Sequence, residues 1–328
     1  MPGGEELGDC VDAVAAGGPT SACPGAPGPS VGLLLPTFPQ SSPLRAAHLT
    51  AVAASAEALG ADALWAADHL FWHGPVLEAM TALTAAATAT SRCTLGTAVL
   101  QLALRSPAVI AKTAASLQEL SRGRFVLGVG AGAHEGEFAA AGVDFAGRGR
   151  ILDHALDELD VLWDDGEALY RQSPRPEPIP VWIGGSGNPA LRRAARRGHG
   201  WMPMFLSPDA LRSRYRQLDA EAVLAGRSPA DITRAVLVFL RTDRGDGGGR
   251  RQGLAWMSSL YRQPEERLAR HLVAGSPAEC VARLAEYVDA GARHLCLFVA
   301  DDDPLPHLDA VIGDLRALAP PPARTVQL

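Results

Sequence analysis

The sequence predicts an α/β protein that folds as one closed (β/α)8 barrel, also called a TIM barrel, in a single domain. Short apolar runs recur along the chain, and each is followed by a segment whose apolar residues have helical spacing. Several of these runs end in glycine or charged residues, as barrel strands do at a ligand-binding edge. An open doubly wound sheet would need fewer strands and a switch in strand order. The eight strands are expected to begin near residues 31, 63, 94, 124, 180, 200, 234 and 294.

Turn residues mark the elements in the first half of the chain. Pro36 stops the first apolar run, and Gly60 ends the helix that follows it. Pro107 lies in the first turn of another helix, where proline is tolerated. The strands are expected at 31–35, 63–67, 94–102 and 124–130, and the helices at 43–59, 75–90 and 107–120.

The second half continues the alternation. Ile151, Ala155, Leu159 and Leu162 are spaced for one face of a helix. Ser276 to Glu279 has the pattern of a capping box, which predicts a helix start. The strands are expected at 180–183, 200–205, 234–241 and 294–299, and the helices at 147–163, 189–197, 208–224, 252–261, 264–273, 276–290 and 306–318.

The two ends of the chain differ in composition from the rest. Residues 1–30 are dominated by Gly, Pro, Ala and Ser, and they lack the basic start and apolar stretch of a secretory signal. We predict that they form a disordered leader. Prolines from residue 320 onward end the last helix, so residues 319–328 are expected to be a loose tail. The barrel domain would span residues 31–318.

Composition argues against several classes of protein. The net charge of -6 does not suit a general nucleic-acid binder. No apolar run reaches the roughly 18 residues that span a bilayer. The five cysteines are odd in number and show no CxxC spacing, so we expect neither a metal site nor a disulfide framework. Cys93 and Cys296 lie in apolar runs and are expected to be buried. We therefore expect a soluble, cytoplasmic protein.

Barrel geometry brings residues from distant segments to one place. The carboxyl ends of all strands in such a barrel form a single mouth, and ligands bind there. The residues at or just after the predicted strand ends should therefore lie around that mouth. They are Pro36, Asp68, His69, Gln101, Gly130, Gly132, His134, Gly184, Gly185, Ser186 and Asp301.

Asp68 and His69 end the second predicted strand. A histidine titrates near neutrality, so His69 could donate or accept a proton, with Asp68 orienting it or binding a cofactor ring. The alternative is that Asp68 caps a turn and His69 is a satisfied, half-buried side chain.

Gly184 to Asn188 form a glycine-rich loop between a strand and a helix. Such a loop lets backbone N–H groups approach an anion, and the helix N-terminus favours negative charge. The loop lacks the lysine of a nucleoside-triphosphate site. It could instead be an ordinary tight turn. The arginines on the next helix could add positive potential or form only a solvated face.

The sequence indicates a binding role less strongly for the other residues near the mouth. Thr97 to Gln101 could form the wall under a flat ring, or simply be barrel core. His134 and Glu135 could flank a substrate or point to water. Trp65, Trp72, Trp182 and Trp201 lie in or just after strands, so some of them could line an aromatic pocket.

Four motifs occur in order along the chain. They are Leu64–Leu70, Leu95–Val99 with Arg105–Lys112, Ser121–Gly130 and Val181–Ser186, and Gly291–Leu295 adds a weaker one. Together they resemble the luciferase-like monooxygenase superfamily and, within it, the actinobacterial oxidoreductases that depend on the deazaflavin coenzyme F420. The resemblance covers roughly residues 31–318.

The resemblance implies a bacterial-luciferase-like barrel with a deazaflavin or flavin ring in its mouth. His69 would lie near the reacting carbon as the catalytic residue, and Asp68 would contact the polar edge of the cofactor. A cis peptide between Ala98 and Val99 would form a bulge behind the ring. The other implied cofactor-binding residues are Gln101, Gly130 and Gly132, with Gly184, Gly185, Ser186 and Gly187 around the tail phosphate.

The expected substrate pocket is Pro36, Trp72, Ala133 and His134. Ala133 stands where deazaflavin dehydrogenases acting on sugar phosphates have an acid and where many close relatives have Trp. Residues 164–179 lack the Gly-aromatic hairpin that many relatives insert. The resemblance therefore does not carry a substrate with it.

We expect hydride transfer between F420 and a small organic substrate, with a proton supplied by His69 or a nearby group. The alternatives are an FMN-dependent monooxygenase, which needs a separate reductase as partner, and a non-catalytic flavin-binding barrel. A phosphate-binding isomerase is a less favoured hypothesis, because no Lys or Glu at a strand end stands out as its catalytic base. A homodimer is possible, as in many relatives.

Overall fold

The structure, a computed structural model, describes residues 28–40, 46–164, 174–245 and 247–318. The expectations for residues 1–27 and 319–328 fall outside these ranges. The strands are β1 (Ser30–Leu34), β2 (Ala63–Ala66), β3 (Thr94–Thr97), β4 (Leu100–Gln101), β5 (Phe125–Gly130), β6 (Val181–Gly184), β7 (Gly200–Met202), β8 (Thr233–Thr242), β9 (Leu272–Gly275) and β10 (His294–Val299).

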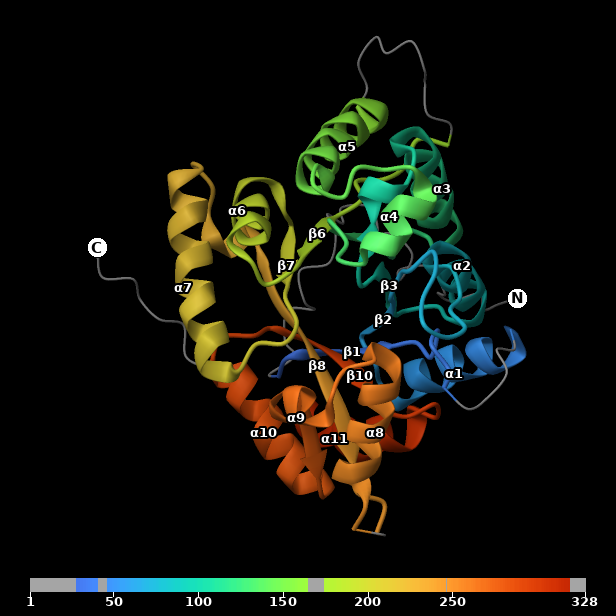
Figure 1. Cartoon of the computed structure of the whole chain (residues 1–328), viewed down its shortest axis with the longest axis vertical. Coiled ribbons are helices and arrows are strands. Elements are labelled where there is room, and N and C mark those ends of the chain that lie inside the picture. Colours follow the sequence, from blue (N-terminus) through green and yellow to red (C-terminus); the bar gives the residue numbers. More distant parts are fainter. Residues whose placement is uncertain (1–27, 41–45, 165–173, 246, 319–328) are drawn as a thin grey trace, which may run out of the picture.

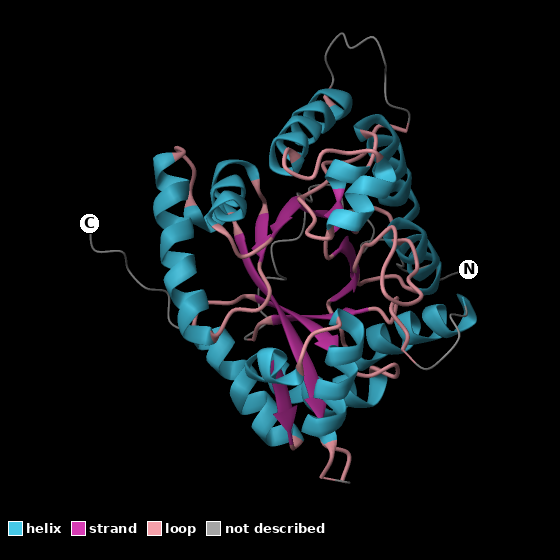
Figure 2. Ribbon diagram, viewed as in Figure 1, coloured by secondary structure: helices cyan, strands magenta, loops and turns pink. Residues whose placement is uncertain are grey.

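These strands are parallel and close into a barrel (Figure 2). The ring runs β1, β2, β3, β5, β6, β7, β8 and β10, and the pairing of β10 with β1 closes it. Closure leaves no free edge in the ring. The predicted (β/α)8 fold is therefore confirmed.

Helices surround the barrel and cover the outer faces of its strands (Figure 1). They are α1 (Ala46–Leu59), α2 (Ala79–Ala89), α3 (Pro107–Leu120), α4 (Glu135–Ala141), α5 (Arg148–Trp163), α6 (Asn188–Arg197), α7 (Pro208–Leu224), α8 (Gly249–Tyr261), α9 (Glu265–Leu268), α10 (Pro277–Asp289) and α11 (Leu305–Arg316). Short 3₁₀ turns lie at Leu102–Leu104, Pro229–Asp231 and Ala269–His271.

Local signals in the sequence place several helix ends correctly. Pro107 begins α3, and Ser276 with Glu279 forms the predicted capping box before α10. The largest buried cluster lies between the strands and these helices. Cys93 and Cys296 are buried free thiols, as expected. Among the described helices, none is long and apolar enough to cross a membrane.

Four local predictions are wrong. The run 94–102 is not one strand, because it is interrupted at Ala98 and Val99 and ends in a 3₁₀ turn. The run 200–205 is strand only to Met202. The helix expected over 264–273 ends early, and β9 follows it and pairs with the last four residues of β8. No helix is predicted from the sequence between residues 130 and 147, where the structure has α4. Short apolar runs fit a helix or a strand equally well, which explains the β9 error.

The interior of the barrel is filled by large rings. Trp65 and Trp182 lie with their ring centroids 4.9 Å apart, and the Trp65 indole donates to Nε2 of buried His294 at 2.9 Å. A Cβ added to Gly96 would lie 2.2 Å from Trp65, and one added to Gly200 would lie 2.6 Å from Trp182. Glycine at these strand positions therefore makes room for the two indoles. This arrangement, the tryptophan plug (Trp65, Trp182 and His294), fills the barrel below its mouth.

Candidate active site

Asp68 lies just after β2 and is buried. Its Oδ1 is 2.6 Å from Nη2 of Arg105, and its Oδ2 accepts the backbone N–H of Gln101 at 2.9 Å. Burial raises the pKa of Asp68, and the Arg105 guanidinium opposes that rise. Both carboxylate oxygens face protein groups, so the expected contact of Asp68 with a cofactor stays a prediction. In the structure, the ion pair of Asp68 with Arg105 joins the end of β2 to the segment after β4.

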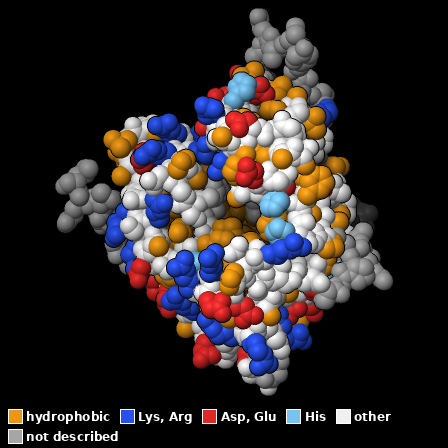
Figure 3. Space-filling view, in the orientation of Figure 1, with side chains coloured by type: hydrophobic (Ala, Val, Ile, Leu, Met, Phe, Trp, Pro, Cys, Tyr) orange, Lys and Arg blue, Asp and Glu red, His pale blue; other side chains and the backbone are white. Residues whose placement is uncertain are grey.

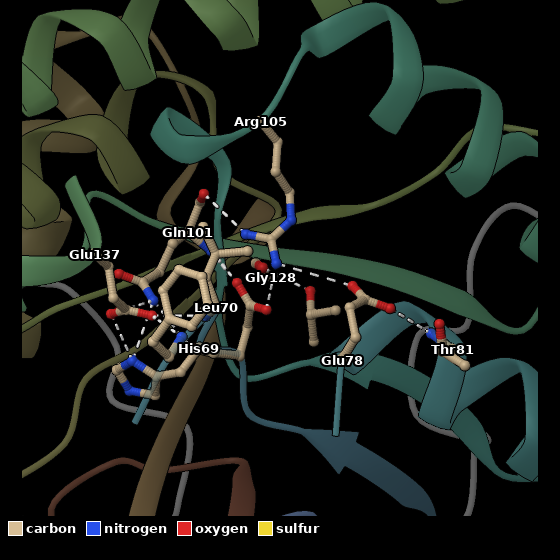
Figure 4. Close-up of polar contacts among 11 residues, drawn as sticks. His69, Leu70, Glu78, Thr81, Gln101, Arg105, Gly128 and Glu137 are labelled. Carbon is tan, nitrogen blue, oxygen red and sulfur yellow. Dashed lines mark hydrogen bonds and ion pairs between the residues drawn. The ribbon is translucent and has the colours of Figure 1, made fainter. Parts of the chain in front are cut away.

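His69 is held from one side by a buried carboxylate. Its Nδ1 lies 2.8 Å from Oε2 of Glu137, which comes from α4 (Figure 4). Because a carboxylate only accepts hydrogen bonds, Nδ1 carries the hydrogen, and Nε2 lies on the opposite side of the ring. No described residue hydrogen-bonds to Nε2. The His69 side chain is 22% exposed, so this nitrogen is the one left for a ligand.

Glu137 has a full set of partners. Its Oε1 accepts the backbone N–H groups of Leu70 and Phe71, and its Oε2 also accepts from Nε2 of Gln101 at 3.1 Å. Although burial alone would raise the pKa of Glu137, these hydrogen bonds and the one from His69 hold it below its usual value. Glu137 therefore stays ionised at neutral pH and fixes the loop that carries His69.

The Ala98–Val99 peptide is cis, as the resemblance implied. Both residues are half-buried, whereas Thr97 and Leu100 on either side are fully buried. The Val99 side chain fills space left by two strand-end glycines, since a Cβ on Gly130 would lie 2.6 Å from it and one on Gly184 2.7 Å. We call Ala98 and Val99 the cis shelf. The lack of a Cβ at Gly130 and at Gly184 is therefore what allows Val99 to pack there.

Rings from five segments meet around the mouth. Trp72 is central, with its ring centroid 3.9 Å from that of His69, 5.6 Å from His134 and 6.1 Å from Tyr261. The Trp72 indole donates to the carbonyl of Leu260 at 2.9 Å, which fixes the ring against α8. The aromatic wall, as we call this set, consists of Phe38, His69, Trp72, His134, Phe205 and Tyr261.

The glycine-rich loop before α6 is exposed. Gly185 has a φ of 102°, a conformation that favours glycine, and Gly187 precedes the first turn of α6. The Ser186 hydroxyl donates to the carbonyl of Met204 at 2.6 Å. Nη2 of Arg214 donates to the Ser186 carbonyl at 2.6 Å, which places a guanidinium beside the loop. The loop therefore offers backbone N–H groups and a nearby positive charge to an anion.

The remaining predicted residues lie in three places. Gln101 and Gly132 lie together, because a Cβ on Gly132 would be 2.4 Å from Oε1 of Gln101, a buried oxygen without a hydrogen-bond partner. Ala133 is exposed beyond β5. Pro36 lines a small cavity with Trp256, Phe298, Asp301 and Phe38, and Phe38 also belongs to the aromatic wall.

Two arginines of α6 form ion pairs with aspartates of α5. Arg193 pairs with Asp153, and Arg197 pairs with Asp157 and Asp160, all on α5. These arginines thus join two helices. Among the described residues, no group of His, Cys, Asp or Glu is arranged to hold a metal ion.

Glu137, Arg105, Arg214 and Tyr261 are site residues that the sequence did not indicate. Arg105 begins one of the motifs that carry the resemblance, whereas Glu137 lies outside all of them. Their burial and their partners depend on contacts between distant segments, so no local pattern could have found them. Figure 3 shows a hollow on this face of the molecule, with apolar side chains at its floor and histidines at its rim.

The fold and this mouth define a barrel enzyme, and comparison with known proteins gives its family. A sequence model described as luciferase-like monooxygenase matches residues 30–257. An F420-dependent glucose-6-phosphate dehydrogenase of Amycolatopsis mediterranei is 30% identical over 291 residues, which cover 75% of this chain and 86% of that protein. The chain therefore belongs to the luciferase-like monooxygenase family and is an oxidoreductase.

Two solved structures share the fold. An F420-dependent secondary alcohol dehydrogenase in complex with an F420-acetone adduct superposes with a TM-score of 0.76 at 19% identity, covering 88% of this chain and 99% of that chain. The oxygenating constituent of 3,6-diketocamphane monooxygenase from Pseudomonas putida, in complex with FMN, has a TM-score of 0.70 at 17% identity, with 89% and 99% covered. At such low identity these likenesses show the fold alone.

Proposed function

We propose that the protein is an F420-dependent oxidoreductase that transfers a hydride between the deazaflavin and a small organic substrate. The observation that carries the proposal is the pairing of His69 with Glu137. It leaves Nε2 of His69, beside the aromatic wall, without a hydrogen-bond partner among the described residues. The similarity to an F420-dependent dehydrogenase over most of the chain supports the choice of cofactor.

The described residues suit such a cofactor. The cis shelf is an apolar, partly exposed surface that would lie against a flat ring, and the unpartnered Oε1 of Gln101 offers a hydrogen-bond acceptor close by. Backbone N–H groups of Gly185 to Gly187, with Arg214 nearby, would hold the tail phosphate. The Ser186 hydroxyl already donates to Met204, so the backbone would carry most of that contact. When bound, F420 supplies or takes up a hydride at carbon 5 of its deazaflavin ring.

His69 would move the proton that accompanies the hydride. In the oxidising direction Nε2, which carries no hydrogen in this tautomer, accepts a proton from the substrate. In the reducing direction Nε2 first takes up a proton from solvent, and the imidazolium then donates it to the substrate. Glu137 is fully buried, so it is a positioning residue that holds Nδ1 of His69 and fixes the direction of Nε2. With both reactants bound, the aromatic wall would limit the access of water to the reacting atoms.

Titration of the purified protein with F420 and with FMN, each in oxidised and reduced form, tests the proposal. We expect micromolar affinity for F420, measured by absorbance and fluorescence, and much weaker binding of FMN. Preferential binding of reduced FMN would instead favour a monooxygenase that depends on a separate reductase. Absence of binding by either cofactor would contradict the redox proposal.

The variant His69→Ala separates the enzyme from a non-catalytic flavin-binding barrel. We expect turnover to fall by about 10²–10⁴-fold, the usual contribution of a general acid or base, with cofactor affinity retained. Unchanged turnover would remove His69 from the mechanism. A homodimer belongs to the same proposal, and sedimentation velocity of the full chain would test it.

A further inference from the structure

The aromatic wall extends well beyond the residues that the proposed proton transfer uses. From Trp72 it continues through Tyr261 to Phe205, whose centroid lies 5.5 Å from that of Tyr261. Phe205 in turn stacks on Phe239 of β8 at 5.5 Å and an angle of 15°. Rings therefore line the mouth from the loop after β2 across to β8.

Most of the positively charged groups near this surface are already engaged by protein groups. Lys112 is the only lysine of the chain and lies on the outer helix α3. Arg105 is paired with buried Asp68, and Arg241 is paired with Asp301 and donates to Gln252. A phosphoryl group on a substrate is normally held by Arg or Lys side chains with free donors. These two arginines already have carboxylate partners.

The rim next to Trp72 provides few additional positively charged donors for a phosphoryl group. Arg262 is exposed and donates to the backbone carbonyl of His73 at 3.3 Å. Desolvation and the Arg262 guanidinium lower the pKa of His73, so this imidazole is neutral at pH 7. The rim next to Trp72 therefore adds the Arg262 guanidinium and a neutral ring. Near the loop after β5, Arg148 donates to the carbonyls of Gly132 and Phe145.

We propose that the substrate is an uncharged aromatic ketone or the corresponding secondary alcohol, and not a sugar phosphate. This inference rests on the proposed function. The aromatic ring of the substrate would pack on Trp72 and Tyr261, which leaves the carbonyl oxygen for Nε2 of His69. In the reducing direction the carbonyl carbon gains a hydride from reduced F420, and the cofactor is left oxidised by two electrons. The oxygen gains a proton from Nε2 of His69, which has first taken up that proton from solvent.

The test is a binding comparison on the full chain saturated with oxidised F420, where a ketone cannot turn over. Calorimetry would measure acetophenone, acetylcyclohexane and glucose 6-phosphate. Because an aromatic pair contributes beyond its buried area, we expect acetophenone to bind about 3- to 10-fold more tightly than acetylcyclohexane. Glucose 6-phosphate should bind at least about 10-fold more weakly than acetophenone.

Variants assign the preference to the aromatic wall. Trp72→Leu keeps apolar volume but removes the central ring, so acetophenone should lose its advantage over acetylcyclohexane. Tyr261→Leu is a second variant with the same expectation. Trp163→Leu, on α5 and hydrogen-bonded to Ala111, is the matched control and should leave the preference unchanged.

Two results would overturn the inference: tighter binding of glucose 6-phosphate than of acetophenone, or equal binding of acetophenone and acetylcyclohexane. F420 affinity measured in the same samples keeps the two proposals apart. A protein that binds F420 but prefers the sugar phosphate contradicts only the substrate class, whereas a protein that does not bind F420 contradicts the proposed function itself.

Discussion

Nδ1 of His69 and Oε2 of Glu137 lie 2.8 Å apart, although 68 positions separate the two residues in the chain. The same carboxylate accepts the N–H groups of Leu70 and Phe71, so α4 is tied to the loop after β2 at three points. The direction of the imidazole is therefore set by a helix that follows another strand of the barrel.

Glu137→Gln should disturb catalysis more than cofactor binding. The amide can present an N–H₂ group to donors that need an acceptor, so His69 and the loop lose their fixed positions. We expect kcat to fall about 10- to 100-fold, the range seen when supporting partners of a site are removed. F420 affinity should stay within about threefold, and the pH profile of kcat/KM should change. A kcat within twofold of the original would refute a positioning role.

Gly184→Ala should push Val99 out of place. The new Cβ would lie 2.7 Å from the Val99 side chain, and overpacking of this kind costs about 1–3 kcal/mol of unfolding free energy. In the Val99→Ala background the same change should cost much less, because the clashing methyl groups are gone. Urea denaturation of all four proteins measures the coupling. Gly313→Ala in α11, where an added Cβ meets nothing within 4 Å, is the control and should not destabilise.

Arg105→Leu should destabilise the fold strongly. It leaves the buried Asp68 carboxylate without its ion-pair partner, a change that costs about 3–5 kcal/mol. The double variant Asp68→Asn/Arg105→Leu removes the unpaired charge and should recover part of that loss. Urea denaturation at pH 7 measures both. A double variant no more stable than Arg105→Leu would show that the carboxylate is not the source of the cost.

His294 makes stability depend on pH. Burial lowers its pKa from 6.5 to about 3, so the folded state holds it neutral while the unfolded chain binds a proton below pH 6.5. Its contribution is fully present above pH 6.5 and is lost as the pH falls toward 3, by up to about 1.4 kcal/mol per pH unit. In His294→Gln this dependence should be absent.

Urea denaturation at pH 7.5, 6 and 5 would measure the slope for both proteins. The exposed His154, whose side chain is 74% accessible, gives the control variant His154→Gln, which should keep the original slope. Equal slopes for the original protein and for His294→Gln would contradict a neutral buried imidazole.

Periodicity and turn residues were enough to predict the barrel, because each strand and helix carries its own local pattern. Asp68 and His69 could be found because they directly follow an apolar run. The cis peptide between Ala98 and Val99 was available only from the resemblance, since two small apolar residues carry no local sign of it.

The partners of the site could not be predicted in the same way. Glu137 looks like any charged residue in a loop, and it is buried only because α4 folds onto the segment after β2. Gly96 and Gly200 look like weak points in strands, whereas they make room for Trp65 and Trp182 across the barrel. In each case the reason for the residue lies in a segment far away in the chain.

The tryptophan plug also bears on kinetics. Trp65, Trp182 and His294 fill the barrel below its mouth, so cofactor and substrate would both have to enter through the mouth. The molecule that binds deeper, which we expect to be the cofactor, would bind first and dissociate last. The substrate would bind and dissociate while the cofactor stays bound. For the proposed reaction we therefore expect ordered binding, with the cofactor before the substrate, and residues far from the reacting atoms would contribute to that order.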